Sequence, residues 1–353
     1  MIKHLARNRR LLLNSAILIV LIFFSQGFIC FPSIEGSNHD KIVVAVITEP
    51  LASVVKYIGG EKVKVVTIIP ANVDPHEYEP PMNTLLSTLS EARLLVVTAQ
   101  HHYIVEEKIY QLIEEGLINV RVIGYEEYLE HGLRLLRNPK TDDINFHGFH
   151  YSINGLRAIA STIASHLSEI DKDNLDYYYN RLMRYFEYID NIENSVDSLI
   201  DRRYRVIIYT PVLQYLVKEL DLDLVDVVVS EYNVEASERD VLRMLSKLKN
   251  GEADFILLSD EEALKNPKLV DLFSKENLKY FTVPLNKVSN MPELASLSIA
   301  LQISSQASVI MGERSSSEYL TLLLLSITVN IVLSIIVIFL VIKGKKSGKR
   351  FSS

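Results

Sequence analysis

The chain contains very little cysteine. Cys30 is the only one among 353 residues, and tryptophan is absent. A single cysteine cannot form an internal disulfide, and it also excludes CxxC redox chemistry and zinc sites built from several thiolates. Cys30 lies in an apolar stretch near the N-terminus, so the rest of the chain has no thiol. Any metal bound there must be held by nitrogen and oxygen ligands.

Positive charge is also scarce. The 37 Lys and Arg residues are outnumbered by 44 Asp and Glu, which gives a formal net charge of −7. A protein that binds nucleic acid generally needs a basic surface to contact phosphates. The charge balance therefore argues against a nucleic-acid partner.

Signature motifs of common enzymes are missing as well. The sequence has no GxGxxG, GxxxxGK[ST], HExxH or GxSxG motif, and these are the usual signs of nucleotide binding, zinc proteolysis and serine hydrolysis. The acidic residues of the middle region are too dispersed to nominate a general acid and base. We therefore expect a protein that is not an enzyme.

Long apolar runs occur only at the two ends of the chain. Residues 1–10 carry four Lys or Arg and no acid, and an apolar stretch from Leu11 to Phe31 follows. This pattern predicts a signal peptide or an uncleaved signal anchor over residues 1–31. At the other end, the 24 residues from Tyr319 to Ile342 carry no charge. They are long enough to form a transmembrane helix across about 30 Å of hydrocarbon.

A basic tail at residues 343–353 follows the second apolar run. The positive-inside rule places such a tail in the cytoplasm. We expect hydrophobic helices at both ends, a single C-terminal span in the cell membrane, and an extracellular region between the two ends. Without its basic ends the middle region is more acidic than the whole chain, which suits cations better than anions.

The middle region alternates strands with helices. Apolar strand patterns cover residues 41–47, 62–69 and 93–99, and helical patterns cover 49–60 and 83–92. This order predicts a parallel sheet whose ligands lie beyond the carboxyl ends of the strands. His76 lies in the loop that follows the second strand.

A long helical pattern separates this region from a second one of the same kind. Residues 175–203 predict one helix of roughly 40 Å, and strand and helix patterns resume after residue 204. We therefore expect an α/β fold of two lobes with parallel sheets joined by a long helix. The expected bounds are 41–150 for the first lobe, 151–203 for the connecting helices and 204–312 for the second lobe.

The motif DPHEYEP, from Asp74 to Pro80, lies between a strand and a helix. Here the sequence resembles the zinc and manganese substrate-binding proteins of ABC importers, and residues 155–192 are similar to that family's connecting helices. The similarity covers most of residues 41–315. It implies a monomeric ectodomain whose first lobe helps to bind a divalent metal in a cleft. The expected metal is zinc more readily than manganese, and no organic cofactor is expected. The implied partners are ABC permease and ATPase subunits.

The resemblance also implies metal ligands, usually three histidines and a carboxylate or two of each. His76 of DPHEYEP corresponds to the first ligand. The second lies in NFHGFHYSINGL, where His147 fits with one extra residue, a gapless alignment lands on Gly148, and His150 is close by. The candidate metal residues are therefore His76, His147 and His150.

The family's two remaining ligand positions hold other residues here. The third falls on Thr210 and the final aspartate falls on Val283. A hydroxyl and a valine cannot replace an imidazole and a carboxylate. The family's alternative carboxylate position falls on Ser259, with Asp260 one residue later.

Three possibilities follow for the site. Substitutes such as Asp260, or either His101 or His102 after the strand at 93–99, complete the metal site; adjacent histidines on an extended loop point apart, so at most one of the pair would bind. Alternatively, water fills open positions and the site is weak. In the third case the protein is a paralogue that acts as a surface binding or scaffold protein for another ligand.

Overall fold

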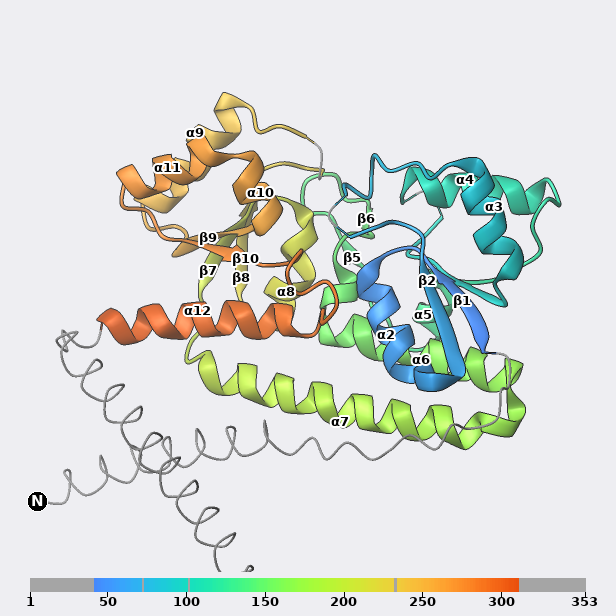
Figure 1. Cartoon of the computed structure of the whole chain (residues 1–353). Helices are drawn as coiled ribbons and strands as arrows, with labels where there is room; N and C mark the ends of the chain where they lie inside the picture. Colours follow the sequence, from blue (N-terminus) through green and yellow to red (C-terminus); the bar gives the residue numbers. More distant parts are fainter. Residues whose placement is uncertain (1–40, 72, 101, 232–233, 311–353) are drawn as a thin grey trace, which may run out of the picture. The chain divides into compact units, whose positions relative to one another are not determined.

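The computed structural model describes residues 41–71, 73–100, 102–231 and 234–310 (Figure 1). These residues all fall in one compact unit that begins at Lys41. Within these ranges, no helix combines the length and the apolar character that a membrane crossing requires. The predicted signal segment 1–31, the span 319–342 and the tail 343–353 lie outside the described residues.

The first lobe is built on a four-stranded parallel sheet with the order β2-β1-β3-β4. In its register, Val44 lies opposite both Val65 and Leu94. The central strands are apolar and buried because helices cover both faces of a parallel sheet. The elements of this lobe are β1 (Ile42–Val46), α2 (Glu49–Gly59), η1 (Gly60–Lys62), β2 (Val63–Thr67), α3 (Met82–Glu91), β3 (Leu94–Val96), α4 (Ile104–Glu114), β4 (Arg121–Ile123) and α5 (Tyr125–Glu130).

The second lobe has the same topology, with the parallel order β8-β7-β9-β10. Each strand of one sheet therefore has a counterpart in the other, although we detect no internal sequence repeat. Its elements are β7 (Arg205–Ile208), η4 (Pro211–Leu213), α8 (Gln214–Glu219), β8 (Asp223–Val227), α9 (Glu238–Lys249), β9 (Phe255–Ser259), α10 (Asp260–Lys265), α11 (Pro267–Lys275) and β10 (Tyr280–Val283). The predicted α/β fold of two parallel lobes is confirmed.

Three helices and a hairpin connect the lobes. The helices are α6 (Ile153–Ile170), α7 (Leu175–Leu199) and α12 (Leu294–Ile310); η3 (Lys172–Asn174) lies between the first two. Before α6 come an antiparallel hairpin of β5 (Leu136–Arg137) and β6 (Ile144–Asn145), and the turn η2 (Phe149–Tyr151). The sequence did not predict the hairpin, because strands of two residues are too short to show alternation.

The long helix α7 runs along both lobes, below α2 and α12 in Figure 1. Its buried side chains recur every three or four residues, as required for one helical face: Tyr178, Leu182, Tyr185, Ile189, Ile192 and Val196. The tyrosine-rich sequence of α7 therefore supplies a packing face. The helix ends at Leu199 rather than at residue 203, because Ile200 adopts an extended backbone conformation.

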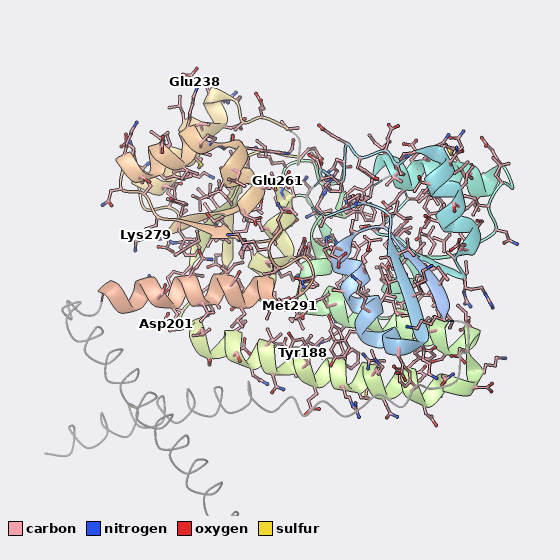
Figure 2. The ribbon with its side chains drawn as sticks, in the orientation of Figure 1. Tyr188, Asp201, Glu238, Glu261, Lys279 and Met291 are labelled. Carbon is pink, nitrogen blue, oxygen red and sulfur yellow. The ribbon has the colours of Figure 1, made fainter. Side chains whose placement is uncertain are left out.

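The main hydrophobic core is continuous from the first lobe, through these helices, to one face of the second sheet. A smaller core covers the other face of that sheet, between it and α9 and α11. Figure 2 shows Tyr188 on α7 and Asp201 just beyond its C-terminal end, whereas Glu261 lies at the edge of the second lobe that faces the first. The helices that connect the lobes and the carboxyl ends of the strands thus lie in separate parts of the molecule.

Replacing Tyr185 with alanine tests the contribution of α7 to this core. Its side chain is 2% exposed and its ring lies 4.8 Å from that of Tyr57. We expect Tyr185→Ala to lower the free energy of unfolding by about 3–5 kcal/mol, as for other buried aromatic residues. Urea denaturation would measure the loss. The control Tyr179→Ala removes a 43% exposed ring from the same helix; equal losses in the two variants would contradict the assignment of the buried face.

Candidate metal site

His76 lies in the loop that follows β2, at the carboxyl end of the first sheet. The backbone N–H of His76 donates to Asp74 Oδ1 at 3.0 Å, which closes a tight turn around Pro75. The same oxygen lies 3.4 Å from His76 Nδ1. Asp74 therefore helps to set the orientation of the imidazole, and both side chains are largely buried.

His102 lies in the loop between β3 and α4. Glu106, at the start of α4, holds this loop because its carboxylate accepts hydrogen bonds from the backbone N–H groups of Thr98 at 2.6 Å and Tyr103 at 3.2 Å. Burial raises the pKa of Glu106 to about 8, although these donors oppose the rise. Glu106 thereby places His102 beside His76. His101 lies outside the described residues.

The counterpart of Glu106 in the second lobe is Glu262. It is buried at the same position of α10, where its carboxylate accepts hydrogen bonds from Ser259 N at 2.6 Å and from the Thr210 hydroxyl. Burial raises the pKa of Glu262 to about 7, while the bonds from Thr210 and Ser259 oppose the shift. Each lobe thus uses a buried glutamate to hold a loop at the carboxyl edge of its sheet.

His147 comes directly after the β5–β6 hairpin. Its backbone N–H donates to Asn145 Oδ1 at 2.9 Å. The amide nitrogen of Asn145 donates to Pro211 O at 2.9 Å and to Gln214 Oε1 at 2.8 Å, and Asn145 O accepts the Tyr215 hydroxyl. These hydrogen bonds attach the hairpin to the second lobe. His147 is therefore positioned by the second lobe, although it precedes the connecting helices in the sequence.

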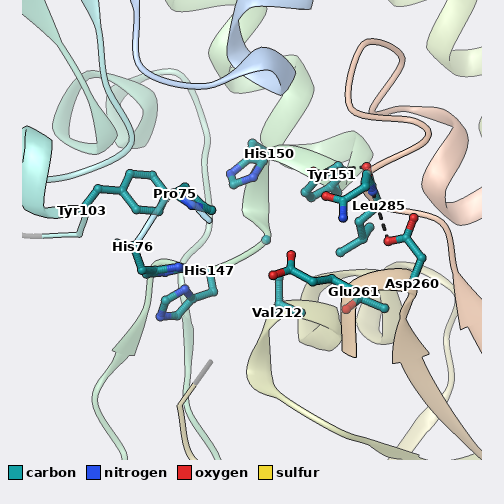
Figure 3. Close-up of a pocket in the computed structure, with 13 residues that line it drawn as sticks. Pro75, His76, Tyr103, His147, His150, Tyr151, Val212, Asp260, Glu261 and Leu285 are labelled. Carbon is teal, nitrogen blue, oxygen red and sulfur yellow. Dashed lines mark hydrogen bonds between the residues drawn. The ribbon is translucent and has the colours of Figure 1, made fainter. Parts of the chain in front are cut away.

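Gly148 allows the chain to turn closely against the second lobe after His147. Its φ of +85° is a conformation that favours glycine, and an added Cβ would lie 2.0 Å from Val212 O. The η2 turn begins at the next residue and includes His150. The turn leads His150 away from His147, to another wall of the same cavity (Figure 3).

Three imidazoles converge where these segments meet. One potential ligand atom from each of His76, His102 and His147 lies within 4.8 Å of the other two. The distances between ring centroids are 5.7 Å for His76 and His102, 5.4 Å for His76 and His147, and 4.5 Å for His102 and His147. For comparison, two ligand atoms on a tetrahedral zinc, with bonds of about 2.0–2.1 Å, lie about 3.4 Å apart. Small side-chain movements would bring all three nitrogens onto one ion.

The environment of the cluster favours the neutral form of two of its imidazoles, those of His76 and His102. Burial lowers the pKa of His76 and lowers that of His102 further, and in both residues the nearby His147 adds to the effect. His102 Nε2 is buried and has no hydrogen-bond partner among the described residues, so this nitrogen can serve as a ligand without breaking a hydrogen bond. Neutral imidazole is the form that binds metals.

Of the three predicted metal residues, the structure brings together His76 and His147. It separates His150, which is 5% exposed and whose pKa burial lowers to about 3. The third imidazole is that of His102, which the sequence offered only as one of several substitutes. Its position after a buried strand was the available signal, because the loops at the carboxyl ends of parallel strands meet.

The second-lobe residues suggested by the resemblance are held by other contacts. Thr210 is fully buried against Glu262, and Val283 is fully buried in the core. Ser259 accepts the Glu262 N–H at the start of α10. Asp260 accepts a hydrogen bond from Asn286 N at 3.2 Å, drawn in Figure 3. These residues support the cavity wall.

An ion pair also joins the two lobes beside the cluster. Lys265 Nζ of α10 lies 3.1 Å from Asp74 Oδ2 and 2.8 Å from Glu261 Oε1. Burial alone would raise the pKa of Asp74, but hydrogen bonds from His76 N–H and Lys265 hold it below its usual value. The carboxylate that orients His76 is therefore in contact with the second lobe as well.

A family model described as "Zinc-uptake complex component A periplasmic", ZnuA, matches residues 43–293. The chain belongs to the ZnuA family. This confirms the resemblance seen in the sequence. Curated relatives include the manganese ABC transporter substrate-binding lipoproteins PsaA of Streptococcus pneumoniae, 24% identical over 71% of this chain and 81% of the relative, and of Streptococcus mitis, 28% identical over 46% and 52%. The match thus spans about half the length of the Streptococcus mitis protein.

Solved structures of the ZnuA type share the fold. A crystal structure of ZnuA superposes with a TM-score of 0.62 at 19% identity, over 75% of this chain and 99% of the other. The FpvC protein of Pseudomonas aeruginosa, solved in complex with Mn2+, gives a TM-score of 0.62 at 20% identity, over 76% of this chain and 99% of the other. At these identities the likeness establishes the fold.

Replacing Gly148 with alanine tests how closely the segment after His147 packs on the second lobe. We expect a loss of unfolding free energy of about 1–2 kcal/mol from the positive φ and about 1–3 kcal/mol more from the clash with Val212 O. Gly132→Ala is the control, because Gly132 has a φ of +96° but no atom within 4 Å of an added Cβ. Urea denaturation would compare them, and equal losses would contradict the close approach.

The Glu262→Gln variant tests the buried carboxyl through pH. Because the folded pKa of about 7 lies above the reference value of 4.5, folding favours the neutral acid. The stabilisation that results from this raised pKa is complete at pH values below the reference pKa and is lost as pH rises through the folded pKa. Between about pH 5 and 8 we expect the wild type to lose more unfolding free energy than the Gln variant. Urea denaturation at both pH values would measure this, and the exposed control Glu130→Gln should keep the wild-type dependence.

Proposed function

We propose that this protein is the substrate-binding component of an ABC importer and that it captures a divalent metal ion with His76, His102 and His147. The observation that supports this most directly is the convergence of three imidazoles from three separate loops. Imidazole is a common ligand for zinc and manganese, and a set rich in nitrogen favours zinc of the two. The metal is the cargo, and no organic cofactor takes part.

The size of the cavity supports an ion rather than an organic solute. His76 and His147 line a cavity of about 90 Å³, with Glu261 and Leu285 on the side of the second lobe. Sites for organic ligands usually have volumes of about 300–1,000 Å³. A scaffold protein that binds an organic ligand in this cavity is therefore the less favoured function.

Metal binding would also connect the lobes. His76 and His102 extend from the first lobe, whereas the hydrogen bonds of Asn145 fix His147 to the second. One ion bound by all three histidines would hold these parts together. The permease partner would then distinguish the loaded protein from the empty one by how the two lobes are held.

The proposed setting is the outer face of the cell membrane. In this proposal, residues 1–31 direct export or remain as an anchor, residues 41–312 form a monomeric two-lobed ectodomain, residues 319–342 span the membrane and residues 343–353 stay in the cytoplasm. Tethering to the membrane would raise the effective concentration of the loaded protein near its permease and ATPase.

Metal titration of the metal-free, full-length protein tests the function. We expect zinc to raise the melting temperature, because a ligand present at about 100 times its Kd stabilises the folded state by about 2.7 kcal/mol. Manganese should give a smaller rise. His76→Ala and His102→Ala should abolish most of the zinc effect, since each removes one of three imidazoles. Differential scanning calorimetry would measure the shifts.

Two histidines outside the cluster provide controls. His131 is exposed on the first lobe and His150 lines the cavity apart from the three imidazoles. His131→Ala and His150→Gln should keep the zinc-dependent rise, measured relative to each variant's own metal-free protein. A wild-type protein whose melting temperature responds to neither metal would contradict metal capture.

A further inference from the structure

We propose that Glu231 of the second lobe is the fourth ligand of the ion held by His76, His102 and His147. This inference rests on the proposed metal-binding function. It assigns the carboxylate to the loop after β8, whereas the resemblance placed the second-lobe ligands after β7, β9 and β10. The contacts of the neighbouring carboxylates lead to this choice.

The three histidines of the proposed site leave one position for the second lobe. Three imidazoles are one ligand short of tetrahedral coordination. Thr210 donates its hydroxyl to Glu262, and Val283 has no ligand atom and is fully buried. The remaining ligand must therefore come from another element of the second lobe or from water.

Three other carboxylates near the cavity already have specific partners. Asp74 accepts the His76 N–H and contacts Lys265, and Asp260 accepts the Asn286 N–H. Glu261 is paired with Lys265 at 2.8 Å. In Figure 3, Glu261 lies beside Val212 and apart from His76 and His147.

Glu231 differs because its carboxylate lies next to one of the candidate ligands and near no lysine or arginine among the described residues. Glu231 Oε2 lies 3.7 Å from His147 Nε2, and within the described part of the chain no Lys or Arg nitrogen lies within 4 Å of this carboxylate. Two ligand atoms on one tetrahedral zinc lie about 3.4 Å apart. The two atoms therefore already have almost the separation that a shared ion requires.

The hairpin that carries His147 also holds the start of the Glu231 loop. The side chain of Asn138, just after β5, donates to Ser230 O at 2.7 Å, and Lys140 donates to Val228 O. Val229 N is bonded to Tyr209 O at 3.0 Å, which continues the β7–β8 pairing up to this loop. Ser230, directly before Glu231, is thus bonded to the same hairpin whose second strand ends at Asn145, two residues before His147.

The exposure and charge of Glu231 suit a ligand that meets an arriving ion. Its side chain is 51% exposed, whereas that of His147 is 18% exposed. An exposed carboxylate can attract the hydrated cation and turn inward with it, and its negative charge partly offsets that of the ion. A set of three nitrogens and one oxygen suits zinc and accommodates harder ions such as manganese.

Zinc and cobalt titrations of the full-length protein test the proposal. Glu231→Gln keeps the shape of the side chain but removes its charge. We expect zinc to bind with unchanged stoichiometry and an affinity lowered by about tenfold or more, the scale of changes around metal ligands. The visible absorption of bound Co2+, which depends on its ligands and geometry, should change in this variant. Isothermal titration and absorption spectroscopy would measure both effects.

Two matched variants separate coordination from a general effect of charge. Glu235→Gln removes an exposed carboxylate four residues further along, and Glu261→Gln removes the rival carboxylate in the cavity. Glu235→Gln should keep the wild-type Co2+ spectrum and a zinc affinity within about threefold. Glu261→Gln should keep the wild-type Co2+ spectrum, since Glu261 is not a ligand in this proposal.

The outcomes distinguish this inference from the function on which it rests. If the wild type binds zinc and Glu231→Gln behaves like Glu235→Gln, the assignment of Glu231 is wrong while metal capture stands. If Glu261→Gln alone loses affinity and changes the spectrum, the ligand is Glu261. If the wild type binds neither metal, the proposed function fails and this inference fails with it.

Discussion

The candidate site depends on the side chain of one buried asparagine, Asn145. Its amide donates to Pro211 O and Gln214 Oε1 on the second lobe and accepts the N–H of His147. The residue is 2% exposed, so each of these polar groups would be costly to leave unpaired. The backbone position of His147 is therefore set by the second lobe. An ion bound by the three histidines would act across the boundary between the lobes for this reason.

The two lobes share a topology but contribute unequally to the site. Both use a buried glutamate, Glu106 or Glu262, to hold the loop after the corresponding strand, β3 or β9. In the first lobe that loop carries His102 into the cluster. In the second lobe the equivalent region has Asp260, whose carboxylate accepts a backbone N–H. The same structural device thus presents a candidate ligand in one lobe and stabilises the cavity wall in the other.

The charges around the cluster are consistent with a cation as cargo. Asp74, Glu231, Asp260 and Glu261 lie around the histidines and the cavity, and Lys265 is paired with two of these carboxylates. Lys265 is half-exposed, so its ion pairs contribute little to stability. Their main effect is to keep Asp74, and through it His76, in contact with the second lobe. Lys265 therefore both pairs with carboxylates beside the cluster and joins the two lobes.

Much of the fold follows from local patterns in the sequence. Apolar strands and helical spacing are properties of short segments, so they predicted the two parallel sheets and the long helix α7. The motif around His76 is also local, since Asp74 and His76 form their turn within three residues. These features could be predicted because the interactions that produce them join near neighbours in the chain.

The composition of the site was decided by the tertiary structure. The sequence around His147 and His150 does not show which of the two joins the cluster. That depends on Gly148, where the chain turns closely against Val212, and on the hydrogen bonds from Asn145 to Pro211 and Gln214, 66 and 69 positions later. Similarly, His102 lies beside His147 because the loop after β3 and the end of the hairpin lie next to one another. Glu231 lies beside His147 because Ser230 is bonded to the same hairpin. The sequence by itself determined the two lobes, the scarcity of sulfur ligands and the histidines that could serve. Only long-range packing decided which of them converge, since coordination depends on distances in space.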